Sequence, residues 1–330
     1  MEKRQLFLII TLLLCTKTQI RAQWETSVSQ PWVVKNYYNP SFVGHLDNIN
    51  TTALYRYQQA NKNDAVPHAN QRVIITCDMP FLFMQRNHGA GIVVYTENYG
   101  SLRNSLLATQ YSYKQSIANG MLNVGIQAGI YNLNYYSGTT NINSDTPQNN
   151  NQQIRVEMTG IQVADIGAGV SWTDKRFYAG FSIMHLNQPG FKIESNNNKT
   201  NTNTSPEMVN GNSKVIDSLR SFIPRTFNFI TGYNIPLFNS LEIQPMLWIL
   251  TDNNQTQIQT IIRMEYNNKL SGGISIVSKN RHSIFIGTTI QGLNLGYAYT
   301  NRSHELYLKY NFALNNLKPK TQPHKSIRIL

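Results

Sequence analysis

The chain has 330 residues, a formal net charge of +12 and a mean hydropathy of −0.36, and 41% of its residues are hydrophobic. After the N-terminus no apolar run approaches the roughly 18–20 residues that a membrane-spanning helix needs, which excludes a helical membrane protein. These totals do not exclude a membrane β-barrel, because its strands alternate apolar and polar residues and so average to the hydropathy of a soluble protein.

Residues 1–22 have the features of an export signal. The basic start MEKRQ precedes the apolar stretch LFLIITLLLC, and TKTQIRAQ supplies a cleavage region. We therefore expect cleavage between Ala22 and Gln23. A lipoprotein site at Cys15 is not expected, because Leu14 stands where a small residue is needed. After cleavage Cys77 is the only cysteine, which excludes a disulfide framework and a CxxC metal site.

The positive charge is scattered along the chain. Lys and Arg number 29 against 17 Asp and Glu, but no dense basic run occurs before the C-terminal tail. We therefore expect a generally basic envelope protein and no nucleic-acid partner.

Alternation of apolar and polar residues with a period of two recurs along the chain and predicts β-strands. The clearest case is LNVGIQAGIY at 122–131, in which Leu122, Val124 and Ile126 oppose Asn123 and Gly125. With strands of about 9–11 residues, we predict strands at 48–58, 69–77, 88–97, 103–114, 121–132, 161–173, 176–185, 225–234, 241–250, 256–266, 269–278, 282–290, 293–300 and 303–312. The number of strands, about fourteen, is even, as in bacterial single-chain barrels.

The polar faces of these strands are rich in Gly, Asn, Gln and Ser instead of charged residues. Examples are Gly125, Gly129, Gly167 and Gly169. Small uncharged residues suit a crowded or narrow lumen better than an open surface, and glycine inside a soluble strand weakens it. The pattern favours an all-β, transmembrane antiparallel barrel over a soluble sandwich.

The connections between the predicted strands alternate in length. If the first strand rises from the periplasm, the long connections 133–160 and 186–224 lie outside the cell, and the short ones at 173–176, 267–269 and 291–292 face the periplasm. Short periplasmic turns and long outer loops are typical of membrane barrels. The exception is DMPFLFMQRN at 78–87, which we interpret as a periplasmic loop that plugs the barrel mouth or docks a partner; alternatively, the second strand is misplaced.

No catalytic, cofactor or metal site is expected. The seven histidines are dispersed, no HExxH, GxSxG or P-loop motif occurs, and GAGIVVY at 89–95 is not followed by a helical pattern. Six charged side chains fall on the predicted inner face and either line a pore or pair with one another to hold the lumen shut, which we favour: Arg56, Arg72, Arg263, Glu265, Glu305 and Lys309.

The last two predicted strands, LNLGYAYT and SHELYLKYNF, form the closing hairpin. Because an open strand edge cannot face lipid, the final strand is expected to pair with the strand at 48–58. Leu308 is then expected to face lipid, and Glu305 to face the lumen and to tolerate glutamine.

Several segments, in order along the chain, resemble the PorP/SprF family of type IX secretion outer-membrane proteins from Bacteroidota. The opening VSQPWVVKNYYNPSFVG resembles the family's N-terminus, and TALYRYQ, GAGIVVYTENYGS, RFYAGFSIMHL, LGYAYT and SHELYLKYNF resemble its strands. The resemblance implies a barrel without known catalysis, needed for protein secretion and, in gliding species, for gliding motility. It also implies contact with outer-membrane lipid and with periplasmic components of the machine, including a peptidoglycan-binding protein.

The predicted organisation is a signal peptide at 1–22, a periplasmic N-terminal segment at 23–47, the barrel at 48–312 and a basic tail at 313–330. Both ends of the mature chain then lie on the periplasmic side and supply candidate partner-docking residues: Ser29, Gln30, Asn39, Pro40, Gly44, Lys318 and Lys320. The alternatives are a substrate-conducting channel or transporter and a soluble exported β-sandwich that binds glycans; an outer-membrane hydrolase lacks a recognisable nucleophile and base.

Overall fold

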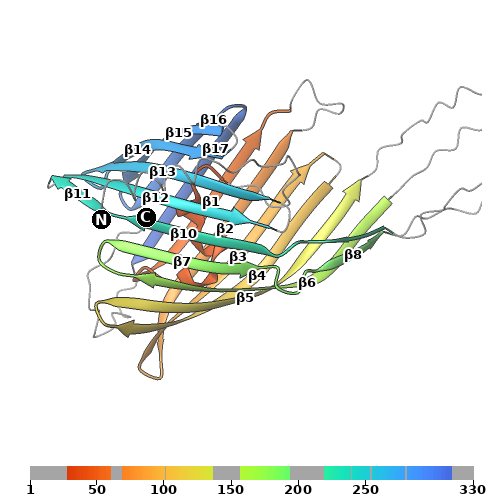
Figure 1. Cartoon of the computed structure of the whole chain (residues 1–330), viewed down its shortest axis with the longest axis horizontal. Coiled ribbons are helices and arrows are strands. Elements are labelled where there is room, and N and C mark those ends of the chain that lie inside the picture. Colours follow the sequence, from red (N-terminus) through yellow and green to blue (C-terminus); the bar gives the residue numbers. More distant parts are fainter. Residues whose placement is uncertain are drawn as a thin grey trace, which may run out of the picture.

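The computed structural model describes residues 28–60, 69–100, 102–136, 157–193, 219–238, 240–252, 255–278 and 281–313. Fourteen antiparallel strands form a closed barrel (Figure 1). They are β1 (Asn48–Gln58), β2 (Asn70–Phe83), β3 (Arg86–Tyr99), β4 (Leu102–Ile117), β5 (Gly120–Tyr136), β6 (Glu157–Thr173), β7 (Phe177–Met184), β10 (Thr226–Tyr233), β12 (Leu241–Thr251), β13 (Thr256–Tyr266), β14 (Leu270–Val277), β15 (Arg281–Ile290), β16 (Leu293–Thr300) and β17 (Ser303–Ala313).

The barrel wall is completed by two pairings, one between its first and last strands and one between β10 and β12. β1 pairs with β17 from Asn48↔Ala313 to Gln58↔Ser303, as predicted for the closing hairpin. β10 pairs with β12, which joins the two halves of the wall. A short extra strand, β11 (Ile235–Phe238), adds to β12, and β8 (Gly190–Ile193) pairs with β9 (Leu219–Phe222) in a separate hairpin. In the described part of the chain, no helix is long and apolar enough to cross a membrane.

The two ends of the barrel differ. The turn end carries the tight connections 84–85, 118–119, 174–176, 267–269 and 291–292, together with β11. The loop end carries the connections that follow β1, β3, β5, β7, β12, β14 and β16. Residues 137–156 and 194–218, which belong to the two longest connections, lie outside the described residues.

The prediction that residues 78–87 form a loop is wrong. β2 continues to Phe83 and β3 begins at Arg86, so that only Met84 and Gln85 form the turn. Both have positive φ, 47° and 59°, as a tight hairpin of this kind requires. The physical reason is that the alternation of the strand does not stop at Cys77: Met79, Phe81 and Phe83 extend its outward-facing row. The alternative, that the second strand is misplaced, holds in that the strand extends six residues beyond its predicted end at residue 77.

The alternation of burial follows the predicted faces. On β17 the inward Glu305 is 1% exposed, whereas its outward neighbours Leu306 and Leu308 are 53% and 44% exposed. The exposed residues of the other strands are likewise mostly Ile, Leu, Phe and Tyr. An apolar outer surface around a polar interior is the arrangement of a membrane barrel.

The N-terminal segment does not lie outside the barrel. Val28–Gly44, which we call the lumenal segment, runs through the interior as η1 (Pro31–Val34), α2 (Lys35–Tyr38) and η2 (Pro40–Phe42). All seventeen of its residues are buried. The physical reason is its content of large apolar side chains, which need a core that an extended periplasmic segment cannot supply.

Candidate functional site

The lumenal segment begins near the loop end of the barrel and ends near the turn end. Ser29 lies beside Glu305 and Thr300, which belong to the loop-end halves of β17 and β16. Gly44 lies beside Asp78 and Lys114, which belong to the turn-end halves of β2 and β4. The lumenal segment therefore runs through the interior from the loop end toward the turn end, and we treat its contacts with the wall as the candidate functional site.

Glu305 anchors the start of the segment. Its two carboxylate oxygens accept hydrogen bonds from the backbone amides of Ser29 at 2.7 Å and Gln30 at 2.8 Å. Gln259 of β13 donates to the carbonyl oxygens of Val28 and Ser29, each at 3.2 Å. Hydrogen bonds to a charged carboxylate are stronger than neutral ones, so this contact fixes the position of the first residues.

The middle of the segment is tied to strands on the opposite wall. The Asn39 amide donates to the carbonyl oxygens of Val170 and Phe181, each at 3.3 Å, and Ser182 Oγ donates to the carbonyl of Tyr38 at 2.6 Å. The Ser182 bond satisfies a backbone carbonyl at the end of α2, which has no partner within that turn, whereas the two Asn39 bonds reach backbone carbonyls of β6 and β7.

The end of the segment is held by Asp78, which accepts a hydrogen bond from the Gly44 amide at 2.8 Å. Ser112 donates to the carbonyl of Val43 at 2.8 Å, and the Lys114 ammonium donates to the carbonyl of Gly44. The segment is thus fixed at both ends and in the middle by polar side chains of the wall.

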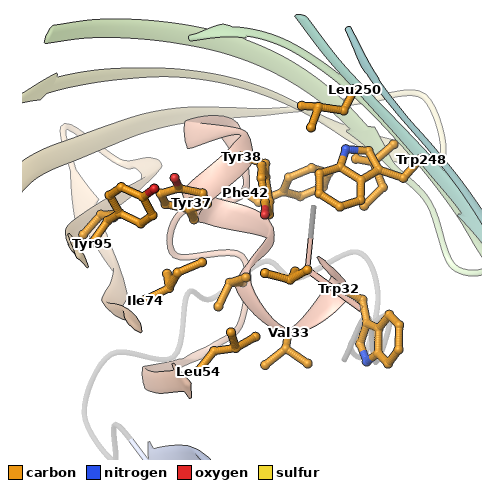
Figure 2. Packing of buried hydrophobic residues seen from close by; sticks show 14 of the residues in the cluster. Trp32, Val33, Tyr37, Tyr38, Phe42, Leu54, Ile74, Tyr95, Trp248 and Leu250 are labelled. Carbon is orange, nitrogen blue, oxygen red and sulfur yellow. The ribbon is translucent and has the colours of Figure 1, made fainter. Parts of the chain in front are cut away.

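Aromatic contacts fill the space between these anchors. Tyr37 stacks on Tyr95 with ring centroids 5.5 Å apart, and Tyr38 meets Trp248 edge-on at 4.3 Å (Figure 2). At another point, Trp32 packs on Phe285 with ring centroids 4.7 Å apart. Such pairs stabilise a core beyond the area that they bury.

Two inner-face glycines allow the segment to approach the wall. A Cβ atom on Gly125 would collide with the backbone of Pro40 and Ser41, and one on Gly169 would collide with the Asn39 side chain. Two of the four glycines that the sequence analysis assigned to a crowded lumen therefore receive the segment itself, whereas Gly129 and Gly167 lie against residues of the wall.

The six charged residues that were expected to face the lumen are all buried inside the barrel, each 8% exposed or less. Arg72 pairs with Glu97 at 2.7 Å, and Arg263 pairs with Glu265 at 2.8 Å. Arg56 lies opposite Glu305 in the pairing of β1 with β17. Lys309 faces a cleft beside the lumenal segment. The two ion pairs therefore lie within the barrel wall, and Glu305 connects the wall to the lumenal segment.

The residues that were expected to dock a partner are differently placed. Ser29, Gln30, Asn39, Pro40 and Gly44 are buried within the lumenal segment, so a partner could contact them only after the segment leaves the lumen. Lys318 and Lys320, like the cleavage site between Ala22 and Gln23, lie outside the described residues.

Sequence reasoning missed several residues of the interior. Glu97 accepts hydrogen bonds from Arg72, Asn70 and the Tyr95 hydroxyl. His185 lies 2.7 Å from the carboxylate of Asp165, and the two are buried. A search of the inward positions for carboxylates would have found Asp165, which lies between the apolar Ala164 and Ile166, and Glu97, which lies two residues after the inward Tyr95. Lys35 carries no such signal, because it lies on a helical turn.

The described residues contain no group of three or more His, Cys, Asp or Glu side chains that could hold a metal ion. What the interior offers is a set of ion pairs and hydrogen bonds that immobilise the lumenal segment. Two clefts lie beside the segment at the turn end, and both have polar linings.

Among solved structures, the chain is similar to a FadL homologue of Pseudomonas aeruginosa, with 10% sequence identity and a TM-score of 0.51, covering 90% of this chain and 99% of that one. It is also similar to the Ralstonia pickettii toluene transporter TbuX, with 10% identity and a TM-score of 0.48, covering 84% and 92% of the two chains. At this identity the likeness shows the fold alone.

A search of curated proteins finds no sequence match. The model of one family, described as type IX secretion system membrane protein PorP/SprF, matches residues 20–313. This match spans the whole barrel and the lumenal segment, and it agrees with the closed fourteen-stranded fold. The chain therefore belongs to the PorP/SprF family of type IX secretion system membrane proteins.

Proposed function

We propose that this protein is a non-enzymatic outer-membrane component of the type IX secretion machinery that links the membrane to periplasmic parts of the machine. The observation that carries the proposal is the lumenal segment, which is buried over its whole length and hydrogen-bonded to β2, β4, β7, β13 and β17. A barrel filled in this way suits a scaffold better than an open conduit.

The turn end, which we assign to the periplasm, offers an exposed surface for such a link. The tip of the β2–β3 hairpin projects from the barrel (Figure 1). Its Leu82, Phe83 and Met84 side chains are 44%, 56% and 80% exposed. Since β1 begins only at Asn48 and pairs with β2 from Asp78 toward the loop end, the tip is not covered by the neighbouring strand. We assign this apolar tip to a periplasmic component of the machine, in accordance with the family.

Affinity purification tests the link. The protein is purified from outer membranes in mild detergent through a tag at the C-terminus, and the proteins that accompany it are identified by mass spectrometry. We expect periplasmic type IX components, including a peptidoglycan-binding protein. The double variant Phe83→Ser, Met84→Ser is expected to lose them, whereas Ile290→Ser, which changes another exposed apolar residue of the turn end, is expected to retain them. Absence of any type IX component from the wild-type preparation would contradict the proposal.

The conducting-channel alternative makes a different prediction. In planar bilayers a barrel sealed by the lumenal segment is expected to show no steady ion conductance, whereas a substrate-conducting channel would show it. Steady conductance of the wild-type protein would therefore favour the channel. Labelling with active-site probes for hydrolases is expected to give no signal.

A further inference from the structure

Two clefts border the lumenal segment at the turn end of the barrel. The polar lining of the first includes Lys35, Asn36, His45, Asp78 and Lys309. The polar lining of the second includes Arg263, Ser271, Thr288, Thr289, Asn294 and Lys309. Trp32, Val33 and Lys309 border both clefts, so Lys309 stands where they meet.

The charges around these clefts do not balance. Among the described buried residues of the turn-end half, four are cations, Lys35, Lys114, Arg263 and Lys309, and two are carboxylates, Asp78 and Glu265. Glu265 is paired with Arg263. An excess of buried positive charge is costly unless a counter-ion compensates it.

Among the described residues, only Arg263 of these four cations has a carboxylate within 4.0 Å; Lys114 donates to the Gly44 carbonyl, which leaves Lys35 and Lys309 beside the first cleft. Each is 8% exposed, and no carboxylate oxygen of the described residues lies within 4.0 Å of either ammonium. The Lys35 ammonium instead lies 4.2 Å from the centroid of the Tyr178 ring. Burial lowers the pKa of Lys35 well below its ordinary value, and the neighbouring Lys309 and Arg263 lower it further.

Asp78 is already engaged by the lumenal segment. One of its oxygens accepts a hydrogen bond from the Gly44 amide at 2.8 Å, and the other accepts from the Asn36 side chain at 3.4 Å. In the same cleft, His45 Nδ1 is buried without a hydrogen-bond partner among the described residues. Burial lowers the pKa of His45 to about 3, so its ring is neutral at pH 7 and carries one N–H.

We propose that the first cleft binds an oxyanion of the phosphate or carboxylate type between Lys35 and Lys309. The two ammonium groups supply charge-assisted hydrogen bonds, and the side-chain amide of Asn36 and the ring of His45 supply neutral ones. The bound oxyanion compensates the excess positive charge and makes the ammonium form of Lys35 favourable. This site rests on the geometry of the clefts and does not depend on the linking role.

Equilibrium dialysis of the full-length protein in detergent tests the proposal. Radiolabelled inorganic phosphate and radiolabelled acetate are titrated separately at constant ionic strength set by chloride, which separates a phosphate-type from a carboxylate-type ligand. We expect saturable binding of at least one of them with one site per chain. Failure of both anions to bind saturably to the wild-type protein overturns the proposal, whatever the variants do.

The variants locate the site. Lys309→Gln, on the barrel wall, and Lys35→Gln, on the lumenal segment, are each expected to weaken binding at least about tenfold. Lys269→Gln, which removes an exposed cation from the β13–β14 turn at the same end, is expected to leave the affinity unchanged. Heat-dependent gel mobility verifies that each variant is folded. An unchanged affinity in folded Lys309→Gln overturns the assignment.

Discussion

Replacement of Glu305 by glutamine tests whether the lumenal segment is held through this side chain. Both carboxylate oxygens of Glu305 accept a backbone amide, one from Ser29 and one from Gln30. Glutamine keeps one acceptor oxygen and presents an NH₂ group to the other amide, so that one buried donor loses its partner. The expectation from the sequence that Glu305 tolerates glutamine is therefore revised.

The size of the effect follows from these two bonds. A hydrogen bond to a charged group contributes about 1.5–3 kcal/mol, and a buried donor left without a partner costs about 1–3 kcal/mol. We call the form in which residues 28–30 have left Glu305 the open form. In Glu305→Gln the free energy needed to reach this form should fall by about 2–4 kcal/mol. Since about 1.4 kcal/mol corresponds to a tenfold change, the open form should become roughly 30-fold to several hundred-fold more populated.

Hydrogen exchange followed by mass spectrometry measures this change in the detergent-solubilised protein. Peptides that cover residues 28–34 should exchange faster in Glu305→Gln by about that factor, whereas peptides of β13 and β14 should not change. Glu265→Gln is the matched control, because Glu265 is also buried in the lumen but is paired with Arg263. Unchanged exchange in residues 28–34, with faster exchange in β1 and β17, would refute the reasoning and would show that Glu305 acts within the wall.

Three further changes probe the outer face, the interior and the packing of the segment. Leu308→Arg should cost about 2–4 kcal/mol if Leu308 lies near the bilayer midplane, and slower assembly of the heat-modifiable barrel, with Leu308→Ile as control, measures it. Arg72→Met should cost about 3–5 kcal/mol in denaturant unfolding, because it leaves the Glu97 carboxylate buried without its cation; the double variant with Glu97→Met should regain most of this loss. Gly125→Val should push Pro40 from the wall at a cost of about 1–3 kcal/mol, detected as proteolysis within residues 28–44 while the barrel stays intact.

Strand periodicity predicted most of the barrel because each strand has a lipid-facing row and an interior row that differ in chemistry. The strands at 48–58, 256–266 and 293–300 have the same bounds in the structure. The short strands β8, β9 and β11 were not predicted, since four residues are too few to define a period. The extension of β2 was missed although Met79 and Phe81 continue the outward row on either side of Pro80, a residue that cannot donate a hydrogen bond to a neighbouring strand.

The lumenal segment could not be predicted from periodicity, because its 3-10 and α-helical turns are too short to give a repeating pattern. Two observations in the sequence nevertheless point to it when they are taken together. The segment contains Trp32, Tyr37, Tyr38 and Phe42, which an exposed terminus cannot accommodate, and the interior faces of β5 and β6 contain glycines that an empty lumen would not need. The apolar segment needs a surface to pack against, and the glycine-rich inner face needs something to fill the space beside it. Each feature is the packing partner of the other. A sequence with an apolar segment before a barrel whose inner face is rich in glycine therefore predicts a lumen filled by its own N-terminal region.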